Sequence, residues 1–347
     1  MDTIGESLSA AAKDWLNGFD AALKSADRQV LSDLFLPNSH WRDLLAFTWH
    51  VITVSGPANI AEALCRHAEE TGAANFRLDE SDAPVRLVIR GGREDVVEAI
   101  YAFETTSGPA QGVFRLLPDE NDGGKLKAWT VLTALMSIAG HEETVGTARP
   151  TGEVYSREFA GPNWQDRRDL AVAYEDRDPE VLVVGGGQAG VSTAARLTQL
   201  GVDTLIVDTH RRVGDNWRKR YHALVLHNQV HVNHFPYFPF PPNWPTYIPK
   251  DKLAGWFEAY VELMELNYWT GTTFSGGAYD EKDGCWNVEL TGEDGTIRQL
   301  RPKHIVMATS VSGIPNLPTI PTLDKFEGEV IHSGKYTGSR DCAGSNV

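Results

Sequence analysis

A glycine-rich turn, set between an apolar run and a helical pattern, constrains this chain more than any other feature. The apolar run Val181–Val184 is typical of a buried parallel strand. Three glycines follow it in the spacing Gly-x-Gly-x-x-Gly, namely Gly185, Gly187 and Gly190. Apolar residues at helical spacing then continue to Leu200. This order predicts a strand, a tight turn and a helix whose N-terminus faces a bound phosphate group.

A second apolar run completes the pattern with an acidic residue. Thr204–Val207 predicts another strand and is followed by Asp208, about 20 residues past the last glycine, where such units place a ribose-binding carboxylate. Gly187 lets a pyrophosphate approach the backbone, and Gln188 stands among the free amides of the helix start. A glycine-rich turn without a ligand is the alternative, but it would need neither the second strand nor the acid. The sequence therefore predicts a dinucleotide-binding βαβ unit.

Composition limits the classes of protein to which the chain can belong. Its 347 residues suffice for about two domains, and a hydrophobic content of 41% allows each to bury a core. A net charge of −15 disfavours nucleic acid or an anionic membrane as the main partner. No apolar run is long enough to span a bilayer, and the three cysteines form no Cys-x-x-Cys pair. These features favour a cytoplasmic protein with no membrane span.

Residues 1–140 precede the glycine motif and need a fold of their own. Helical patterns come first, at 8–22, 27–35 and 56–72. Patterns of period two follow, separated by glycine-rich turns, at 76–78, 85–89, 96–103, 112–117 and 126–137. Helices followed by an antiparallel meander predict an α+β domain. Residues 141–178 are typical of a linker that packs along the second domain, which we expect at 179–347.

This order of elements resembles the cone-shaped NTF2-like or SnoaL-like fold, in which a curved sheet wraps around helices. The resemblance covers roughly residues 10–140 and depends on element order. Such domains often enclose an apolar pocket, which Trp41, Asp43 and His50 could line; the alternative is that His50 is an ordinary core or surface histidine. The resemblance also allows a ligand-binding or dimerisation module without chemistry of its own, so a homodimer is among our expectations.

The segment after the second predicted strand resembles that of the flavin-containing monooxygenases, which carry a Gly-Gly-x-Trp turn and then an Arg-Tyr pair. The matching residues are Gly214, Trp217, Arg220 and Tyr221, with Val213 in place of the first glycine. The resemblance implies that amides near Gly214 approach the phosphates of FAD and that Trp217 offers a flat wall to a planar ring. Arg218 or Arg220 would neutralise phosphate charge. Ordinary core packing is the alternative for Trp217.

Two further segments match flavin-facing positions of the same family. An asparagine that lies near the flavin falls on His227 here, with Asn228 beside it, so the resemblance implies one or the other. A later Ala-Thr-Gly turn packs near the dinucleotide and matches Ala308 and Thr309, with Ser310 in place of glycine. We expect this serine to be tolerated if its φ angle is negative.

The histidines of the first of these segments do not predict a metal site. His227, His231 and His234 have a spacing that would suit ligands on a helix. The β-branched and proline residues around them oppose a helix, and no acidic or cysteine ligand is close. We expect solvated or flavin-edge histidines and no bound metal.

Residues 326–336 resemble the motif Phe-x-Gly-x-x-x-His-x-x-x-(Tyr/Phe), which identifies N- and S-oxygenating flavin monooxygenases and YUCCA-like enzymes. The family implies a three-layer, Rossmann-type FAD-binding domain, with a parallel sheet and an antiparallel meander. It also implies a second glycine motif for NADPH, which this sequence lacks. We therefore expect an incomplete FAD-binding domain with an open sheet edge, a C-terminally truncated chain, and an NADPH site largely outside it.

These resemblances imply an FAD- and NADPH-dependent monooxygenase. NADPH would reduce FAD, O2 would add at the flavin C4a, and the hydroperoxide would transfer one oxygen to a soft nucleophile, N or S, of a small organic substrate. No residue is assigned as a catalytic acid or base. A YUCCA-like oxidative decarboxylation of a 2-oxo acid is the rival choice of substrate. The alternative in another class is a truncated, non-catalytic flavoprotein remnant whose NTF2-like domain serves ligand binding or dimerisation.

Overall fold

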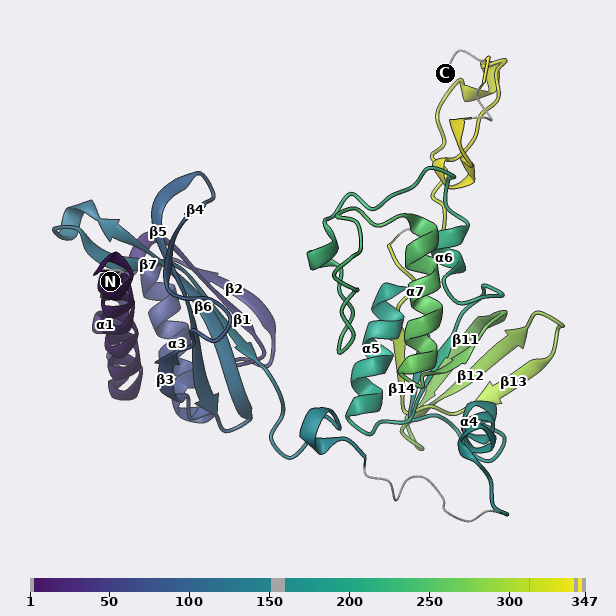
Figure 1. Cartoon of the computed structure of the whole chain (residues 1–347), viewed down its shortest axis with the longest axis horizontal. Helices are drawn as coiled ribbons and strands as arrows, with labels where there is room; N and C mark the ends of the chain where they lie inside the picture. Colours follow the sequence, from purple (N-terminus) through teal and green to yellow (C-terminus); the bar gives the residue numbers. More distant parts are fainter. Residues whose placement is uncertain (1–2, 151–159, 312, 340–342, 345–347) are drawn as a thin grey trace. The chain divides into compact units, whose positions relative to one another are not determined.

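The computed structural model divides the chain into two compact units, unit 1 (Met1–Glu142) and unit 2 (Glu143–Val347) (Figure 1). The structure describes residues 3–150, 160–311, 313–339 and 343–344, and each unit is considered by itself. Within these residues, no helix combines the length and the apolar character needed to cross a membrane.

Unit 1 combines three helices with a mixed sheet. The helices are α1 (Thr3–Ser25), α2 (Arg28–Asp33) and α3 (Pro57–Thr71). The strands are β1 (Phe35–Leu44), β2 (Val51–Ser55), β3 (Ala74–Leu78), β4 (Arg86–Arg90), β5 (Arg93–Thr105), β6 (Gly108–Asp119) and β7 (Lys125–Leu135). Their order is β2-β1-β7-β6-β5-β3, with β4 also paired to β5; the β1–β7 pair is parallel and the others are antiparallel. The coarser expectation of helices with a sheet is confirmed.

The first part of this sheet departs from the sequence prediction. Residues 36–55 carried no predicted element, yet they form most of β1 and all of β2. The helix expected at 27–35 ends at Asp33, because Phe35 already belongs to β1. Pairing with β7, in which Trp41 lies opposite Val131, holds β1 as a strand although Pro37 and Asn38 interrupt its apolar pattern.

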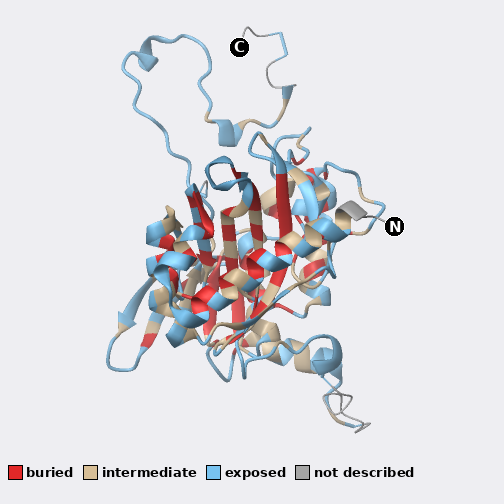
Figure 2. Cartoon of the chain, turned by 90° about the vertical axis from the view of Figure 1, so that its left-hand side faces the viewer, coloured by how far each residue is buried: buried red, intermediate tan, exposed pale blue. Residues whose placement is uncertain are grey.

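One aromatic core joins all three helices to one face of the sheet, here called the inner face. The rings of Trp15 and Phe19 on α1 stack with centroids 5.3 Å apart, and Phe114 of β6 lies 4.7 Å from Trp15. Phe76 and Phe103 stack 4.8 Å apart between β3 and β5. In Figure 2 the buried positions run along the strands and the inward helix faces. Burial of each such ring contributes about 1.5–3 kcal/mol.

The residues expected to line a pocket in unit 1 do not meet in one. Trp41 is fully buried, and its Nε1 donates to Thr133 Oγ1 at 3.0 Å. The buried Asp43 carboxylate accepts hydrogen bonds from Thr133 Oγ1 at 2.6 Å and from Thr48 Oγ1 at 2.7 Å. His50 is exposed. Asp43 is therefore a satisfied structural carboxylate that holds the turn after β1, and the alternative of a surface histidine holds for His50.

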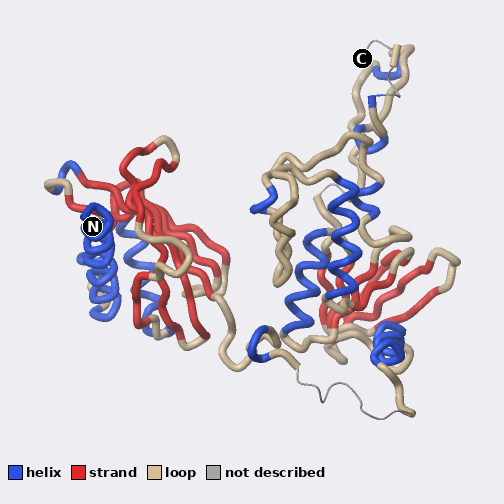
Figure 3. The backbone as a smooth tube through the Cα atoms, in the orientation of Figure 1, coloured by secondary structure: helices blue, strands red, loops and turns tan. Residues whose placement is uncertain are grey.

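Unit 2 is a three-layer α/β arrangement. Its helices are α4 (Trp164–Ala173), α5 (Gln188–Gln199), α6 (Asp215–Arg218) and α7 (Lys250–Leu263). Its strands are β8 (Val181–Val184), β9 (Thr204–Val207), β10 (Asn267–Trp269), β11 (Thr272–Asp280), β12 (Cys285–Gly292), β13 (Ile297–Leu300) and β14 (His304–Met307). A parallel sheet runs in the order β10-β9-β8-β14, and β11-β12-β13 form a separate antiparallel meander (Figure 3).

The two faces of the parallel sheet enter separate cores. Val181 and Val183 pack with α5 and α7, whereas Leu182 and Val184 pack with the meander. Burial on both faces explains the continuous apolar run of β8. Strand β14 pairs only with β8 among the described residues, and Met307 at its end is 60% exposed.

The chain enters unit 2 at the C-terminal end of α5. Thr144 N–H donates to the backbone oxygen of Gln199 at 2.8 Å. Glu143 accepts hydrogen bonds from Arg196 at 2.8 Å and from the Tyr237 hydroxyl at 2.6 Å. Burial and this bond to Glu143 raise the pKa of Tyr237 to about 12. Farther on, α4 lies where a linker was expected, and Trp164 of that helix donates to Glu265.

Candidate functional site

The β8–α5 unit requires glycine at one position of its turn and at one position in the first turn of the helix. Gly185 has φ +105°, and a Cβ there would lie 2.6 Å from the backbone oxygen of Ala308. A Cβ on Gly190 would lie 1.9 Å from the backbone oxygen of Gly185. The first glycine therefore permits the turn and the approach of the strand beside it, and the other permits close packing of α5.

The start of α5 is free of protein groups that would block a ligand. Gly187 is the N-cap residue and provides no side-chain cap. A Cβ on Gly187 would meet only Asn216 Nδ2, at 3.5 Å, so the protein leaves room in front of this residue. Gln188 opens the helix and is half-buried. Uncapped amides and the positive end of the helix dipole favour an anion here.

Asp208, directly after β9, connects the second strand to the glycine loop. Its Oδ2 accepts the backbone N–H of Gly186 at 2.7 Å. Its Oδ1 accepts the backbone N–H of His210 at 2.8 Å and lies 2.7 Å from His210 Nδ1. A carboxylate offers about four acceptor positions, so these contacts leave capacity for a ribose hydroxyl.

The turn at Gly214 lies against α7. Gly214 has φ +84°, and a Cβ there would lie 2.5 Å from the backbone oxygen of Ala254. The turn leads into the single helical turn of α6. Glycine is thus required for a close approach between two protein segments, which is a structural role beside any contact with phosphate.

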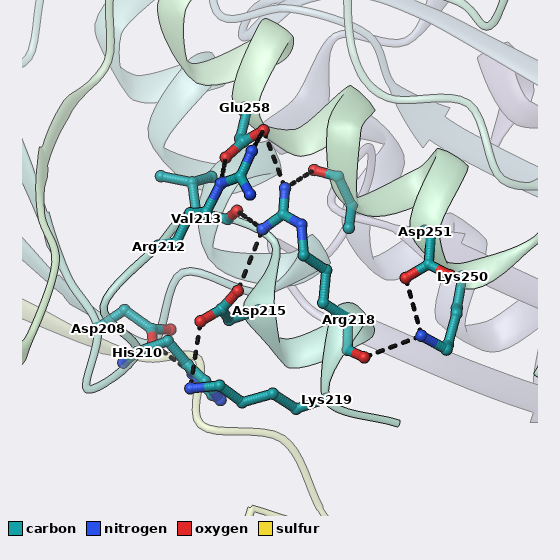
Figure 4. Close-up of polar contacts among 11 residues, drawn as sticks. Asp208, His210, Arg212, Val213, Asp215, Arg218, Lys219, Lys250, Asp251 and Glu258 are labelled. Carbon is teal, nitrogen blue, oxygen red and sulfur yellow. Dashed lines mark hydrogen bonds and ion pairs between the residues drawn. The ribbon is translucent and has the colours of Figure 1, made fainter. Parts of the chain in front are cut away.

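Arg218 holds this turn through contacts within the protein (Figure 4). Its guanidinium donates to the backbone oxygen of Val213 at 2.6 Å and pairs with Asp215 at 3.2 Å and Glu258 at 2.9 Å. The same Glu258 also binds Arg212. The expected phosphate contact of Arg218 stays a prediction, whereas the contacts present give it a positioning role between α6 and α7.

Two buried polar atoms of α6 have no partner among the described residues, and one of them belongs to Asn216, whose Nδ2 would lie 3.5 Å from a Cβ on Gly187. They are Asn216 Oδ1 and Trp217 Nε1. Unpaired buried polar atoms are rare in folded proteins, so such a pair indicates a group that the protein alone does not supply. The ring of Trp217 is partly buried against the core of unit 2, which matches the packing alternative as well. The orphaned atoms and the open space at Gly187 together fit a bound dinucleotide such as FAD.

The remaining predicted site residues lie in two places. Ala308 N–H donates to the backbone oxygen of Val184 at 2.8 Å, which sets Ala308 and Thr309 beside the glycine loop. His227 and Asn228 are both exposed, and no interaction links them to that loop. Ser310 has φ +68°, so the condition under which we expected it to replace glycine without strain is not met.

Sequence reasoning missed two residues that shape the loop. Tyr268 of β10 projects toward Gly186, because a Cβ on that glycine would lie 1.7 Å from the tyrosine hydroxyl. Burial, and then the charge of Asp208, raise the pKa of Tyr268. Asn216 is the other. The spacing Gly-x-x-Trp brackets Asn216 and marks its turn, but no local pattern marks Tyr268, which lies far along the chain.

No group of three or more histidine, cysteine or acidic residues in the described segments is arranged to hold a metal ion. His231 and His234 are exposed, and His234 Nδ1 accepts the backbone N–H of Phe240 at 3.0 Å. His234 therefore holds the loop at Phe240, whose ring packs against Trp256 of α7.

Comparison with known proteins finds a family model that includes the glycine loop. A family model described as an NAD(P)-binding Rossmann-like domain matches residues 183–243. Indole-3-pyruvate monooxygenase YUCCA1 of Oryza sativa subsp. japonica is 31% identical over 184 residues, which cover 53% of this chain and 43% of the relative. Probable indole-3-pyruvate monooxygenase YUCCA4 of Arabidopsis thaliana is 31% identical over 170 residues, covering 49% and 40%. The chain spans less than half the length of these relatives.

Two solved structures are also similar. The flavin-containing monooxygenase from Stenotrophomonas maltophilia is 22% identical, with 48% of this chain and 49% of that chain covered and a TM-score of 0.43. S-allyl-L-cysteine S-oxygenase from Allium sativum is 18% identical, with 47% and 43% covered and a TM-score of 0.43. The curated relatives thus show that about half of this chain is similar in sequence to YUCCA indole-3-pyruvate monooxygenases.

Proposed function

We propose that this chain carries the FAD-binding part of an FAD- and NADPH-dependent monooxygenase that oxygenates a soft nucleophile, N or S, of a small organic substrate. The observation that carries the proposal is the uncapped start of α5, which faces open space beside Asp208 and the orphaned polar atoms of Asn216 and Trp217. Homology to flavin-dependent monooxygenases supports it.

Each part of the loop has a role in this proposal. The backbone from Gly185 to Gly190, with Gln188, binds the pyrophosphate, and Asp208 accepts the ribose hydroxyl. The turn at Gly214 and the ring of Trp217 flank the dinucleotide, with Arg218 holding that turn. Ala308 and Thr309 line the loop from β14. FAD, when bound, supplies the redox chemistry with O2, and the protein supplies binding, orientation and exclusion of water.

Some parts of the proposal depend on segments other than this loop. His227 or Asn228 would approach the flavin. The named YUCCA relatives favour a 2-oxo acid as the rival substrate. The competing function is a non-catalytic flavoprotein remnant, in which unit 1 binds a ligand or dimerises.

The experiment that tests the proposal measures flavin in the purified full chain. We expect stoichiometric FAD absorbance that bleaches on addition of NADPH without oxygen. Gly187→Val should abolish flavin retention, because its side chain occupies the space in front of α5. Gly255→Val is the matched control, since a Cβ at Gly255 meets nothing within 4 Å and the residue lies on α7. Flavin that NADPH does not reduce favours the remnant, and failure to bind FAD overturns both functions.

A further inference from the structure

A row of polar residues crosses the face of the unit 1 sheet opposite the helices, here called the outer face. Each member lies directly opposite the next on the neighbouring strand. The row is Arg86, Glu98, Arg115, Thr130, His40 and Ser55, on β4, β5, β6, β7, β1 and β2. The residues before and after Glu98 on β5 show the alternation, because Val97 and Ala99 belong to the inner core. The row is therefore a continuous polar strip on the outer face.

Three arginines converge on the single carboxylate of this strip. Arg86 donates to Glu98 at 2.8 Å, Arg90 at 3.1 Å and Arg115 at 2.7 Å. The Glu98 side chain is 5% exposed, since the guanidinium groups cover it. Burial alone would raise the pKa of Glu98, but the hydrogen bonds from the three arginines lower it to about 2. Glu98 is thus ionised throughout the physiological range.

The charge of this cluster is not balanced. One carboxylate faces three guanidinium groups, so the arginine cluster (Arg86, Arg90 and Arg115) keeps an excess of two positive charges in a chain whose net charge is −15. Between a third and a half of each arginine side chain is exposed. The excess therefore faces water rather than another part of unit 1.

Donor atoms remain for a further ligand. Arg115 contacts Glu98 through Nε, and no hydrogen bond within the described part of the chain uses its two terminal nitrogens. Arg86 and Arg90 both donate through Nε and Nη2, which leaves Nη1 of each without such a bond. Beside Arg115, the hydroxyl of Thr130 is buried and has no partner among the described residues.

We propose that the arginine cluster is a binding site for a phosphate group, with Arg115 and Thr130 as its direct contacts. A planar guanidinium fork matches the geometry of phosphate oxygens, and two excess positive charges match a dianion. The Thr130 hydroxyl can donate to the same oxyanion, which would satisfy the one buried polar atom at this place that the protein leaves unpaired. The phosphate belongs to a free ion or to a small phosphate monoester.

The test titrates inorganic phosphate and, separately, glycerol phosphate into the full chain by calorimetry at constant ionic strength. We expect saturable binding that Arg115→Gln weakens about tenfold or more, the loss typical of one charge-assisted hydrogen bond. Arg42→Gln is the matched control: Arg42 lies on the same face, bonds Thr53, and its loss changes the net charge equally. Tighter binding of the ester than of the free ion identifies the source.

Two further variants keep the result interpretable. Thr130→Val preserves every arginine and should weaken phosphate binding several-fold without unfolding unit 1. Gly187→Val, in the glycine loop of unit 2, should leave this binding unchanged, which separates it from any phosphate held by α5. Absence of saturable binding, or an equal loss in Arg42→Gln and Arg115→Gln, would overturn the proposal, whether or not the chain binds FAD.

Discussion

The hydroxyl of Tyr268 occupies the place that a side chain on Gly186 would need, at 1.7 Å from its Cβ position. The neighbouring Gly187 has more room, because a Cβ there would meet Asn216 Nδ2 as its nearest contact, at 3.5 Å. Adjacent glycines of one loop therefore have different roles. Gly186 allows Tyr268 of β10 to pack against the loop, and Gly187 leaves space in which a ligand can bind.

These roles predict that replacement by alanine mainly lowers stability at Gly186 and mainly lowers FAD affinity at Gly187. Gly186→Ala should destabilise unit 2 by about 3 kcal/mol, since its Cβ would collide with the partly buried ring of Tyr268. Gly187→Ala should cost no more than about 1 kcal/mol of stability and should instead weaken FAD binding. Urea unfolding and flavin fluorescence titration measure the two effects. Equal destabilisation by both variants would contradict the assignment of Gly187 to a ligand.

Substitution of Asp208, at the end of β9, should lower FAD affinity more than substitution of Asp203, at the start of the same strand. Asp208→Asn removes the charge at the proposed ribose contact and weakens the bond to Gly186, so we expect FAD affinity to fall by about tenfold or more. Asp203→Asn is the control, because Asp203 binds Tyr174 and Arg177 at the start of β9. That variant should lower the melting temperature and leave FAD affinity unchanged; a loss of affinity in both would count against a ribose contact.

Alanine substitutions at Gly214 and Gly295 separate the cost of backbone strain from the cost of a steric clash. Gly214→Ala combines a left-handed φ of +84° with a Cβ 2.5 Å from Ala254 O, whereas Gly295→Ala has φ +83° and nothing within 4 Å. Strain alone costs about 1 kcal/mol, and we expect at least about 1 kcal/mol more at Gly214. Chemical denaturation of both variants gives the difference. Similar losses of stability in the two variants would show that α7 moves to accommodate the added Cβ.

The ion pairs of Glu98 predict a pH dependence of stability. The pKa of Glu98 is about 2 in the folded protein and about 4.3 in an unfolded chain, so its contribution is present above the unfolded value and is lost as pH falls toward 2. Glu98→Gln should remove up to about 3 kcal/mol at pH 7 and flatten the decline between about pH 4.3 and pH 2.

The matched control for this prediction lies on the same strand. Glu104 is exposed and contacts Arg77 at 3.9 Å, so Glu104→Gln should change stability by less than about 0.5 kcal/mol and should leave the acid decline intact. Denaturant unfolding of both variants, followed by a spectroscopic signal from unit 1 at several pH values, provides the measurement. An unchanged acid decline in Glu98→Gln would show that other carboxylates cause it.

Local patterns predicted β8, the glycine turn and α5, because each of these elements depends mainly on residues that are close in the sequence. Strand β1 escaped prediction because Pro37 and Asn38 read as turn residues; they lie at an irregularity in its pairing with β7, which holds Phe35 before them and His40–Leu44 after them in the sheet. Helix α4 has weak apolar periodicity, yet its capping box, in which Asn163 and Asp166 each bond the other's backbone N–H, was a signal available in the sequence.

The environment of the candidate site was harder to predict than its motif. Tyr268 reaches Gly186 from a strand that follows far later in the chain, so no spacing rule connects them. Arg218 was assigned to phosphate from its position in a motif, but its contacts with Glu258 and Val213 depend on how α7 packs. Side-chain partners chosen by tertiary packing are outside the reach of local sequence patterns.

The attachment of Thr144 and Glu143 to the last turn of α5 keeps this stretch of backbone away from the other end of the helix. Twelve helical residues, which rise about 1.5 Å each, span about 18 Å between these contacts and the turn at Gly187. Residues 143 and 144 therefore leave the uncapped amides at the helix start unobstructed.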